Sequence, residues 1–142
     1  MSFDLKIFNG DLVIGTNGDF SQVKYSEKLI QDILKILMTE TGTNVHFQWY
    51  GSLLSASMVG SPYDTQFIAT VAENQIRSSL ETIQNLQKEQ ATRQFVSPSE
   101  LLAAIKSVNV IRNQIDPTFF SINLAVLTKN LTIAKTSFNV TL

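Results

Sequence analysis

The residues that could do chemistry in this 142-residue chain are one histidine and twelve carboxylates. The histidine, His46, cannot form a histidine cluster or a His-Glu-x-x-His metal motif alone, and beside Phe47 and Trp49 it suits packing better than catalysis. The absence of cysteine removes thiolate nucleophiles and every cysteine-based zinc site. No glycine-rich phosphate-binding motif occurs. We therefore predict no metal or cofactor site.

A pair of carboxylates could serve a glycosidase, one as the acid and one as the nucleophile or base. Most acids, however, stand where turns and helices use them. Glu40 remains, at a helix end, and it lacks an obvious second acid. We therefore predict no catalytic pair. The structural positions are turns for Asp11, Asp19 and Asp116, helix starts for Glu27, Asp64 and Glu100, and helix faces for Asp32, Glu73, Glu81 and Glu89.

Composition narrows the class of partner. The net charge of −1 comes without a cluster of Lys and Arg, so we expect no nucleic-acid binding. No apolar run reaches the roughly 20 residues that cross a bilayer, and the first residues do not resemble a signal peptide. The length fits one domain, 1–142. The mean hydropathy of +0.07 leaves two interpretations open: an ordinary domain with an apolar surface, or a surface normally covered by partners.

These features must be positioned by a chain that opens with two tight turns. Asn9-Gly10-Asp11 and Asn17-Gly18-Asp19 each join alternating apolar positions, which predicts a three-stranded meander over residues 3–23. Helical spacing of apolar residues follows over 27–40, with Ser26 as the expected N-cap and Gly42 just after the C-terminus. Residues 43–61 show no clean period and are expected to form an irregular connection.

Two further helices are expected. Ser61-Pro62-Tyr63-Asp64 is a start signal for a long helix over 62–93. Its polar side carries glutamines, which suit either a plain surface helix or a helix that packs on another subunit; we favour the second slightly. Ser97-Pro98-Ser99-Glu100 is a capping box that predicts a short third helix through Ile105. The glutamines are residues 66, 75, 84, 87, 90 and 94.

The C-terminal part changes to a period of two and predicts strands. Phe120, Ile122, Leu124 and Val126 share one face. In the final strand the apolar phase slips, from Leu131 and Ile133 to Phe138, Val140 and Leu142, which predicts a bulge near Lys135-Thr136. The fold class is therefore α+β: an N-terminal β-meander, two main helices of which one is long, a short third helix, and C-terminal antiparallel strands in a mixed sheet. Its last strand is expected to leave an open edge.

Residues 4–52 resemble the small baseplate wedge proteins of contractile phage tails, also called sheath initiators and often labelled lysozyme-like. The shared pattern runs from Asp4-Leu5 through Asn9-Gly10-Asp11-Leu12, a second Gly-Asp, Glu27 to Ile33, Leu37-Met38-Thr39 and Gly42 to Tyr50-Gly51-Ser52. The Glu-Pro-Arg signature of some members is absent, and Gln48-Trp49 stands where others have a proline. The second half is similar in its Gln-rich helix, Ser-Pro-Ser-Glu start, Asp-Pro-Thr turn and two final strands.

The resemblance implies a structural protein of the virion, made in the bacterial cytoplasm, that forms a sixfold ring at the tail baseplate. It would bind other wedge proteins and start the tail sheath, whose protein adds strands to its sheet; hub or tube proteins are further candidate partners. The alternative is a tail-associated peptidoglycan hydrolase. The residues expected to pair with a partner are Phe120, Ile122, Leu124, Val126, Ile133, Phe138, Val140 and Leu142. The expected structural motif is Asn9, Gly10, Asp11, Asn17, Gly18, Asp19, Gln31 and Asp32, with Tyr50, Gly51 and Ser52 as a corner.

Overall fold

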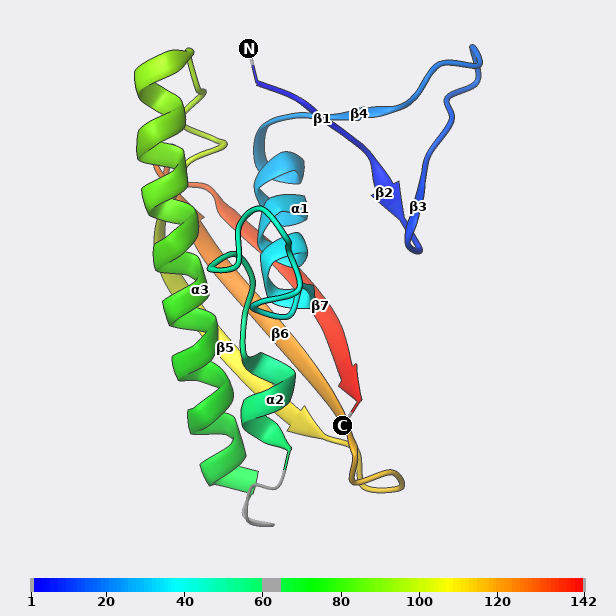
Figure 1. Ribbon diagram of the computed structural model, residues 1–142, viewed down its shortest axis with the longest axis vertical. Coiled ribbons are helices and arrows are strands. Elements are labelled where there is room, and N and C mark those ends of the chain that lie inside the picture. The colour runs from blue at the N-terminus through cyan, green and yellow to red at the C-terminus, as the bar shows by residue number, and fades with distance from the viewer. Residues whose placement is uncertain (1, 60–64, 142) are drawn as a thin grey trace.

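A computed structural model describes residues 2–59 and 65–141 and shows an α+β fold, as predicted (Figure 1). The C-terminal half contributes a three-stranded sheet, the helices cover one face of it, and a thin β arm projects at the N-terminus. The sheet contains β5 (Leu102–Arg112), β6 (Phe119–Thr128) and β7 (Ile133–Thr141). The helices are α1 (Tyr25–Met38), α2 (Leu54–Met58) and α3 (Thr65–Arg93). The arm contains β1 (Asp4–Leu5), β2 (Ile7–Phe8), β3 (Asp11–Leu12) and β4 (Gln22–Val23).

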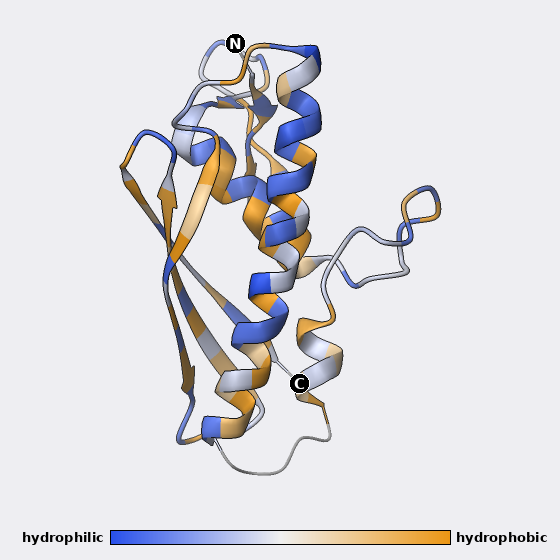
Figure 2. Cartoon of the chain, turned by 90° about the vertical axis from the view of Figure 1, so that its left-hand side faces the viewer, coloured by the Kyte–Doolittle hydropathy of each residue, from blue (hydrophilic) through white to orange (hydrophobic). Residues whose placement is uncertain are grey.

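The C-terminal sheet has the order β5-β6-β7 and is antiparallel throughout, rather than mixed. The alternation predicted for β6 is present, and all four predicted apolar residues of that strand face the helices. Figure 2 shows the resulting change between hydrophobic and hydrophilic colours along the strands. The buried residues of β6 that form the middle of the core are Phe120, Ile122, Leu124 and Val126.

The helices complete this core with apolar residues at helical spacing. From α1 the fully buried residues are Leu29, Ile33 and Ile36, and from α3 they include Ala72 and Ile76. Both helices were predicted, but α1 begins at Tyr25, so Ser26 lies inside it, and the N-cap residue is Lys24, whose side chain makes no capping bond. It ends at Met38, which leaves Gly42 in a following turn instead of directly after the helix. The start signal at residues 61–64 lies outside the described residues.

Two predictions about the irregular regions need correction. The connection predicted over 43–61 is irregular from 43 to 53, but Leu54–Met58 forms a short helix, α2, whose Leu54 and Met58 are buried in the core. The predicted third helix does not form, because Ser97–Glu100 makes a single turn and the chain then enters β5 at Leu102. There the backbone pairs with β6.

The predicted bulge in β7 is also absent, because its pairing with β6 is continuous from Ile133 to Thr141. The apolar phase slips for another reason: Leu131 belongs to the turn before the strand, and Ile133 points to solvent, where it is 50% exposed. The irregularities lie in β5, between Leu102 and Ala104 and again between Ile105 and Ser107.

Candidate strand-pairing site

The free edge of β7 is the longest regular run of unpaired backbone in the sheet. The amide of Thr128 donates to the carbonyl of Thr132 at 2.9 Å, which makes these two residues a hydrogen-bonded pair. Because such pairs alternate along an antiparallel ladder, every second residue of β7 from Ile133 turns its N–H and C=O away from β6. We call these groups the β7 edge. They belong to Ile133, Lys135, Ser137, Asn139 and Thr141.

The β7 edge lacks the features with which proteins commonly block strand addition. It has no proline and no bulge, and Lys135 is its single charged residue. All five residues of the β7 edge are exposed. Backbone groups arranged in this way can accept a further strand.

The opposite edge, along β5, differs. Two register shifts interrupt it in its first half. The Gln84 side-chain amide of α3 donates to the carbonyls of Leu102 and Ala103 at 3.4 and 3.1 Å, so α3 also occupies backbone acceptors there. Both features oppose strand addition at this edge.

The structure corrects the expectation that β6 pairs with a partner. This strand lies in the centre of the sheet with β5 on one side and β7 on the other, so neither of its backbone edges is free. Phe120, Ile122, Leu124 and Val126 are core residues instead. In β7, Phe138 and Val140 are also buried in the core, Ile133 belongs to the β7 edge, and Leu142 lies outside the described residues.

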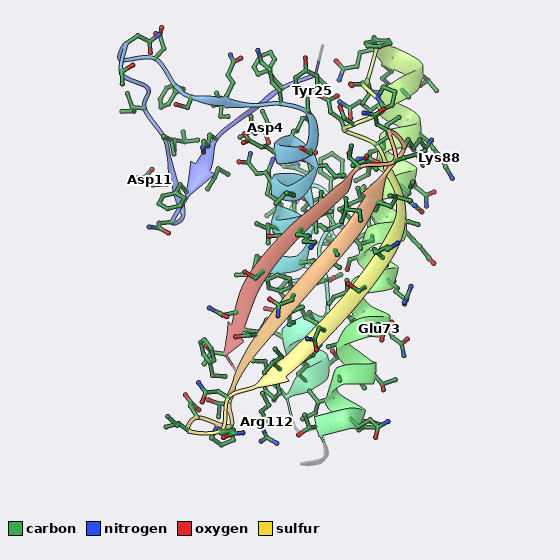
Figure 3. All side chains as sticks on the ribbon, turned by 180° about the vertical axis from the view of Figure 1, so that it is seen from behind. Asp4, Asp11, Tyr25, Glu73, Lys88 and Arg112 are labelled. Carbon is green, nitrogen blue, oxygen red and sulfur yellow. The ribbon has the colours of Figure 1, made fainter. Side chains whose placement is uncertain are left out.

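The N-terminal arm, residues 3–23, uses both Asn-Gly turns, with positive φ at Asn9, Gly10 and Gly18. Asp11 follows the first turn at β3, while Asn17 and Asp19 bond to each other across the second at 3.0 Å. Its pairing differs from the predicted meander, because β1 pairs with β4, the last segment, while β2 pairs with β3. Figure 3 shows Asp11 at the tip formed by β2 and β3 and Asp4 beside α1.

One face of this arm is apolar and uncovered. Directly opposite residues share a face of a ribbon, so Ile7 lies with Leu12, and Ile14 with Phe20. Leu12 and Ile14 are two residues apart and therefore also share that face. The exposed fractions of these four side chains range from 42% to 64%.

Gln31 of α1 fixes the base of the arm. Its side-chain oxygen accepts the amide of Ile7 at 2.9 Å, and its nitrogen donates to the Asp4 carboxylate at 3.0 Å and to the carbonyl of Leu5 at 2.8 Å. Gln31 is 9% exposed, so these bonds are largely shielded from water. The sequence placed Gln31 in a structural motif, and the structure shows the contacts that it makes.

An ion-pair network lies beside this glutamine. Lys35 contacts Asp4 and, at 3.5 Å, Asp32, which also pairs with Lys28 at 2.7 Å. Burial alone would raise the pKa of Asp4, but hydrogen bonds from Lys35 and Gln31 and the lysine charge outweigh it and lower this pKa. Burial likewise opposes the charge of Lys35, but its two carboxylate partners raise its pKa. The carboxylate of Asp4 is thus held in its charged form by Lys35 and Gln31.

Tyr50-Gly51-Ser52 folds back on the end of α1. The Ser52 hydroxyl donates to the carbonyl of Leu37 at 2.8 Å, and the Ser52 amide donates to the carbonyl of Thr39 at the same distance. Gly51 has φ of +127°, and a Cβ there would come within 2.6 Å of the Thr39 carbonyl oxygen. Only glycine therefore fits this approach without a shift of the backbone.

Two buried polar residues were not singled out from the sequence for their long-range contacts. Glu100 is 2% exposed, and its carboxylate accepts the amides of Tyr25 and Ser97 at 3.3 and 3.2 Å. Gln87 of α3 donates to the carbonyl of Glu100 and accepts the amide of Leu102, both at 2.8 Å. The capping-box pattern correctly indicated the bond to Ser97. No local signal indicated the bond to Tyr25, which lies 75 residues away.

No group of three or more metal-ligating side chains occurs among residues 2–59 and 65–141. The same part of the chain holds no helix that is long and apolar enough to span a bilayer. A hollow of about 500 Å³ lies against the sheet, and its lining includes Ser107, Asn109, Asn123, Lys135 and Ser137. None of its lining residues is a carboxylate.

Comparison with known proteins identifies the fold. No protein-family model matches the chain, and no curated protein matches its sequence. A crystal structure of a candidate tail lysozyme from Geobacter sulfurreducens has a similar fold, with a TM-score of 0.61 over 93% of this chain and 96% of that one. The two sequences are 16% identical over the match. This likeness supports the fold over almost the whole length of both chains.

Proposed function

We propose that this chain is a structural subunit of a contractile phage tail. In this proposal it lies in the baseplate of the virion as part of a sixfold ring. It links the wedge proteins to the tail sheath and initiates the sheath by accepting an extended strand of the sheath protein. The chain has no catalytic role in this proposal.

The observation that carries the proposal is the β7 edge. Five alternate residues offer an N–H and a C=O each along a strand without proline or bulge. Strand addition to such an edge draws its affinity from main-chain hydrogen bonds. The fold shared with a protein named as a candidate tail lysozyme supports the tail as the location. The resemblance of residues 4–52 to sheath initiators supports the finer assignment.

The apolar face of the arm supports a role inside a larger assembly. Ile7, Leu12, Ile14 and Phe20 form a contiguous exposed surface on one side of a thin ribbon. Exposed apolar patches of this kind commonly mark protein contacts. Between the two interpretations of the high hydropathy, this favours a surface that partners cover. In a baseplate, the arm would contact the wedge.

The test is seeding of sheath by a variant whose β7 edge is blocked. Ser137→Pro removes an outward N–H and puts a ring in the path of an added strand. The Ser137 amide does not bond to β6, so the ladder inside the chain is kept. Ser137→Ala is the matched control, because it loses the hydroxyl but keeps the amide. The chain and variants would be mixed with the sheath protein of the same particle, and sheath polymers counted by electron microscopy.

We expect Ser137→Ala to seed sheath like the unaltered chain and Ser137→Pro to reduce the number of sheaths at least tenfold. Equal seeding by both variants, with both shown to be folded by thermal denaturation, would reject the proposal. Deleting β7 is a poor substitute, because Phe138 and Val140 would leave the core.

The competing function is peptidoglycan hydrolysis, for which the name of the structural neighbour is the support. A general acid in a glycosidase needs a raised pKa, whereas the pKa of Asp4 is lowered by its bonds to Lys35 and Gln31. Incubation of the purified chain with peptidoglycan distinguishes the two functions. We expect no release of soluble fragments. Release that persists through further purification would favour the hydrolase.

A further inference from the structure

We infer that the partner strand at the β7 edge is amphipathic, and that its apolar side chains pack against a stripe on α1 formed by Ile30, Leu34 and Met38. This inference rests on the proposed strand addition and specifies what the added segment must look like. Its apolar residues would alternate with polar ones, the apolar set facing α1 and the polar set facing solvent.

The stripe is the apolar flank of α1 that the core leaves incompletely covered. The three residues are four positions apart, so they follow one another along one side of the helix. Ile30 and Leu34 are partly buried against the core, and Met38 is 63% exposed. At about 100° per residue, the stripe lies between the core-facing Ile33 and Leu37 and the side of α1 that carries the arm.

The other flank of α1 is polar and has a neighbour already. It carries Lys28 and Asp32, which pair with each other at 2.7 Å. Tyr50 lies near Lys35, Asp32 and Asp4 and is packed against the core. Figure 1 shows α3 on one side of α1 and the arm on the other, which is also the side on which β7 ends the sheet. The flank with the stripe therefore faces the space that a strand paired with β7 would occupy.

The spacing of the stripe suits an extended segment. Residues four apart on a helix rise about 6 Å, and same-face residues of a strand are about 6.6 Å apart. A strand added to β7 continues the pleat of the sheet. Its helix-facing side chains then extend the apolar layer that Ala134, Phe138 and Val140 form beneath α1. A helix placed there would leave the N–H and C=O groups of the β7 edge unsatisfied, so an extended chain is the occupant that both surfaces fit.

The outward face of the added strand meets different chemistry. The solvent face of β7 begins with Ile133 and continues with the polar residues Lys135, Ser137, Asn139 and Thr141. Asn139 accepts a hydrogen bond from Ser121 of β6. Small polar residues of the partner match these neighbours across the sheet. The chemical class of the partner is thus an extended segment of about nine residues with alternating branched apolar and small polar side chains.

The experiment uses two synthetic peptides as probes. In the first, five valines alternate with four serines or threonines, with a lysine at each end for solubility. The second has the same composition with its valines consecutive. The full chain carries ¹³C-methyl methionine, so the exposed Met38 reports on the stripe and Met58, which is 1% exposed, is an internal control. Amide hydrogen exchange at Ser137 and Asn139 reports on the β7 edge.

We expect the alternating peptide to slow exchange at both amides at least tenfold and to shift the Met38 methyl resonance while leaving that of Met58 in place. The consecutive peptide should bind at least tenfold more weakly. Met38→Lys should weaken binding of the alternating peptide at least fivefold, whereas Val45→Lys, at an 84% exposed apolar site that belongs neither to the stripe nor to the β7 edge, should leave it unchanged.

Two failures are distinguishable. If Ser137→Pro abolishes binding but Met38→Lys and the order of valines have no effect, the edge pairs strands and the inference about α1 is wrong. If Ser137→Pro leaves peptide binding and sheath seeding intact, the edge is not the docking site and the proposed function fails. Binding of both peptides with equal affinity also overturns the inference.

Discussion

The N-terminal arm and the C-terminal sheet are both antiparallel β structures, but different forces hold them in place. The sheet is stabilised by burial, with Phe120, Ile122 and Leu124 at 0%, 0% and 2% exposure. The arm has almost no core of its own and is attached to α1 through the Gln31 amide and the Asp4–Lys35 ion pair. The difference implies that the sheet unfolds only with the whole domain, whereas the arm can detach alone.

The largest expected effect tests burial in the two regions with the same substitution. Phe120→Ala should lower the free energy of unfolding by about 3–5 kcal/mol, because a fully buried ring is removed from the core. Phe8→Ala, in the arm at 66% exposure, should change it by less than about 0.5 kcal/mol. Urea denaturation followed by circular dichroism measures both. A large loss in Phe8→Ala would mean that the arm is part of the cooperative unit.

Two glutamines allow the attachment of the arm to be compared with the stability of the whole domain. Gln31 and Gln87 are similarly buried, at 9% and 8%, and each bonds to backbone groups of a different element. Substitution by Met leaves those backbone groups without partners, at a cost of about 1–3 kcal/mol. We expect Gln87→Met to lower global stability and Gln31→Met to accelerate amide exchange of Ile7 while exchange in β6 stays unchanged. Equal global losses would remove the distinction between arm and sheet.

As pH falls, the arm should detach from α1 at a higher pH than the one at which the rest of the domain unfolds. The pKa of Asp4 is lowered in the folded chain. Its contribution to the stability of the arm's attachment is therefore complete above the unfolded pKa of 3.8 and is lost as pH falls through the folded pKa. Lys35 behaves in the opposite way, because its pKa is raised in the folded chain. Its contribution to stability is complete below the unfolded pKa of 10.5 and is lost as pH rises through the folded pKa. Attachment of the arm should therefore weaken below about pH 4 and again at strongly alkaline pH.

The amide of Ile7 is the probe for this release, because it bonds to Gln31 beside Asp4. We expect its resonance to move toward a random-coil position with acid, while that of Ile122 in β6 does not. Asp4→Asn, which cannot ionise, should abolish the acid transition at Ile7. A transition that survives this substitution would assign the pH dependence to another group.

The contrast between arm and sheet also explains what the sequence could predict. Period-two and helical patterns are set by burial, so β6, β7, α1 and α3 were predicted from residues such as Phe120 and Ile33. The turns of the arm were equally visible in Asn9-Gly10 and Asn17-Gly18, because their conformations are chosen locally. Which arm segments pair with one another was not visible, since that depends on contacts with Gln31.

The capping box at Ser97–Glu100 shows where local reasoning ends. The bond between the Ser97 amide and the Glu100 carboxylate forms at 3.2 Å, as the pattern predicts. The helix does not continue, because Gln87 and β6 bind the backbone of Leu102 and direct it into a strand. The start signal thus specified one turn, and tertiary pairing decided the conformation of the eleven residues of β5. The order of the sheet, which decides which strand has a free edge, is likewise a tertiary property.

The smallest expected effect concerns the turns. The arm places Asn9, Gly10 and Gly18 at positive φ, whereas the turn between β6 and β7 places Leu131 there, with φ of +60° and 80% exposure. A left-handed backbone costs a leucine about 1–2 kcal/mol, and an exposed side chain recovers little of it. Leu131→Gly should therefore raise the free energy of unfolding by about 0.5–1 kcal/mol, once the larger unfolded-state entropy of glycine is subtracted.

Leu131→Asn should raise the free energy of unfolding by a similar amount, because asparagine tolerates this conformation. If both variants are less stable than the unaltered chain, the Leu131 side chain stabilises the turn despite its exposure, and turn chemistry is not a difference between the two regions.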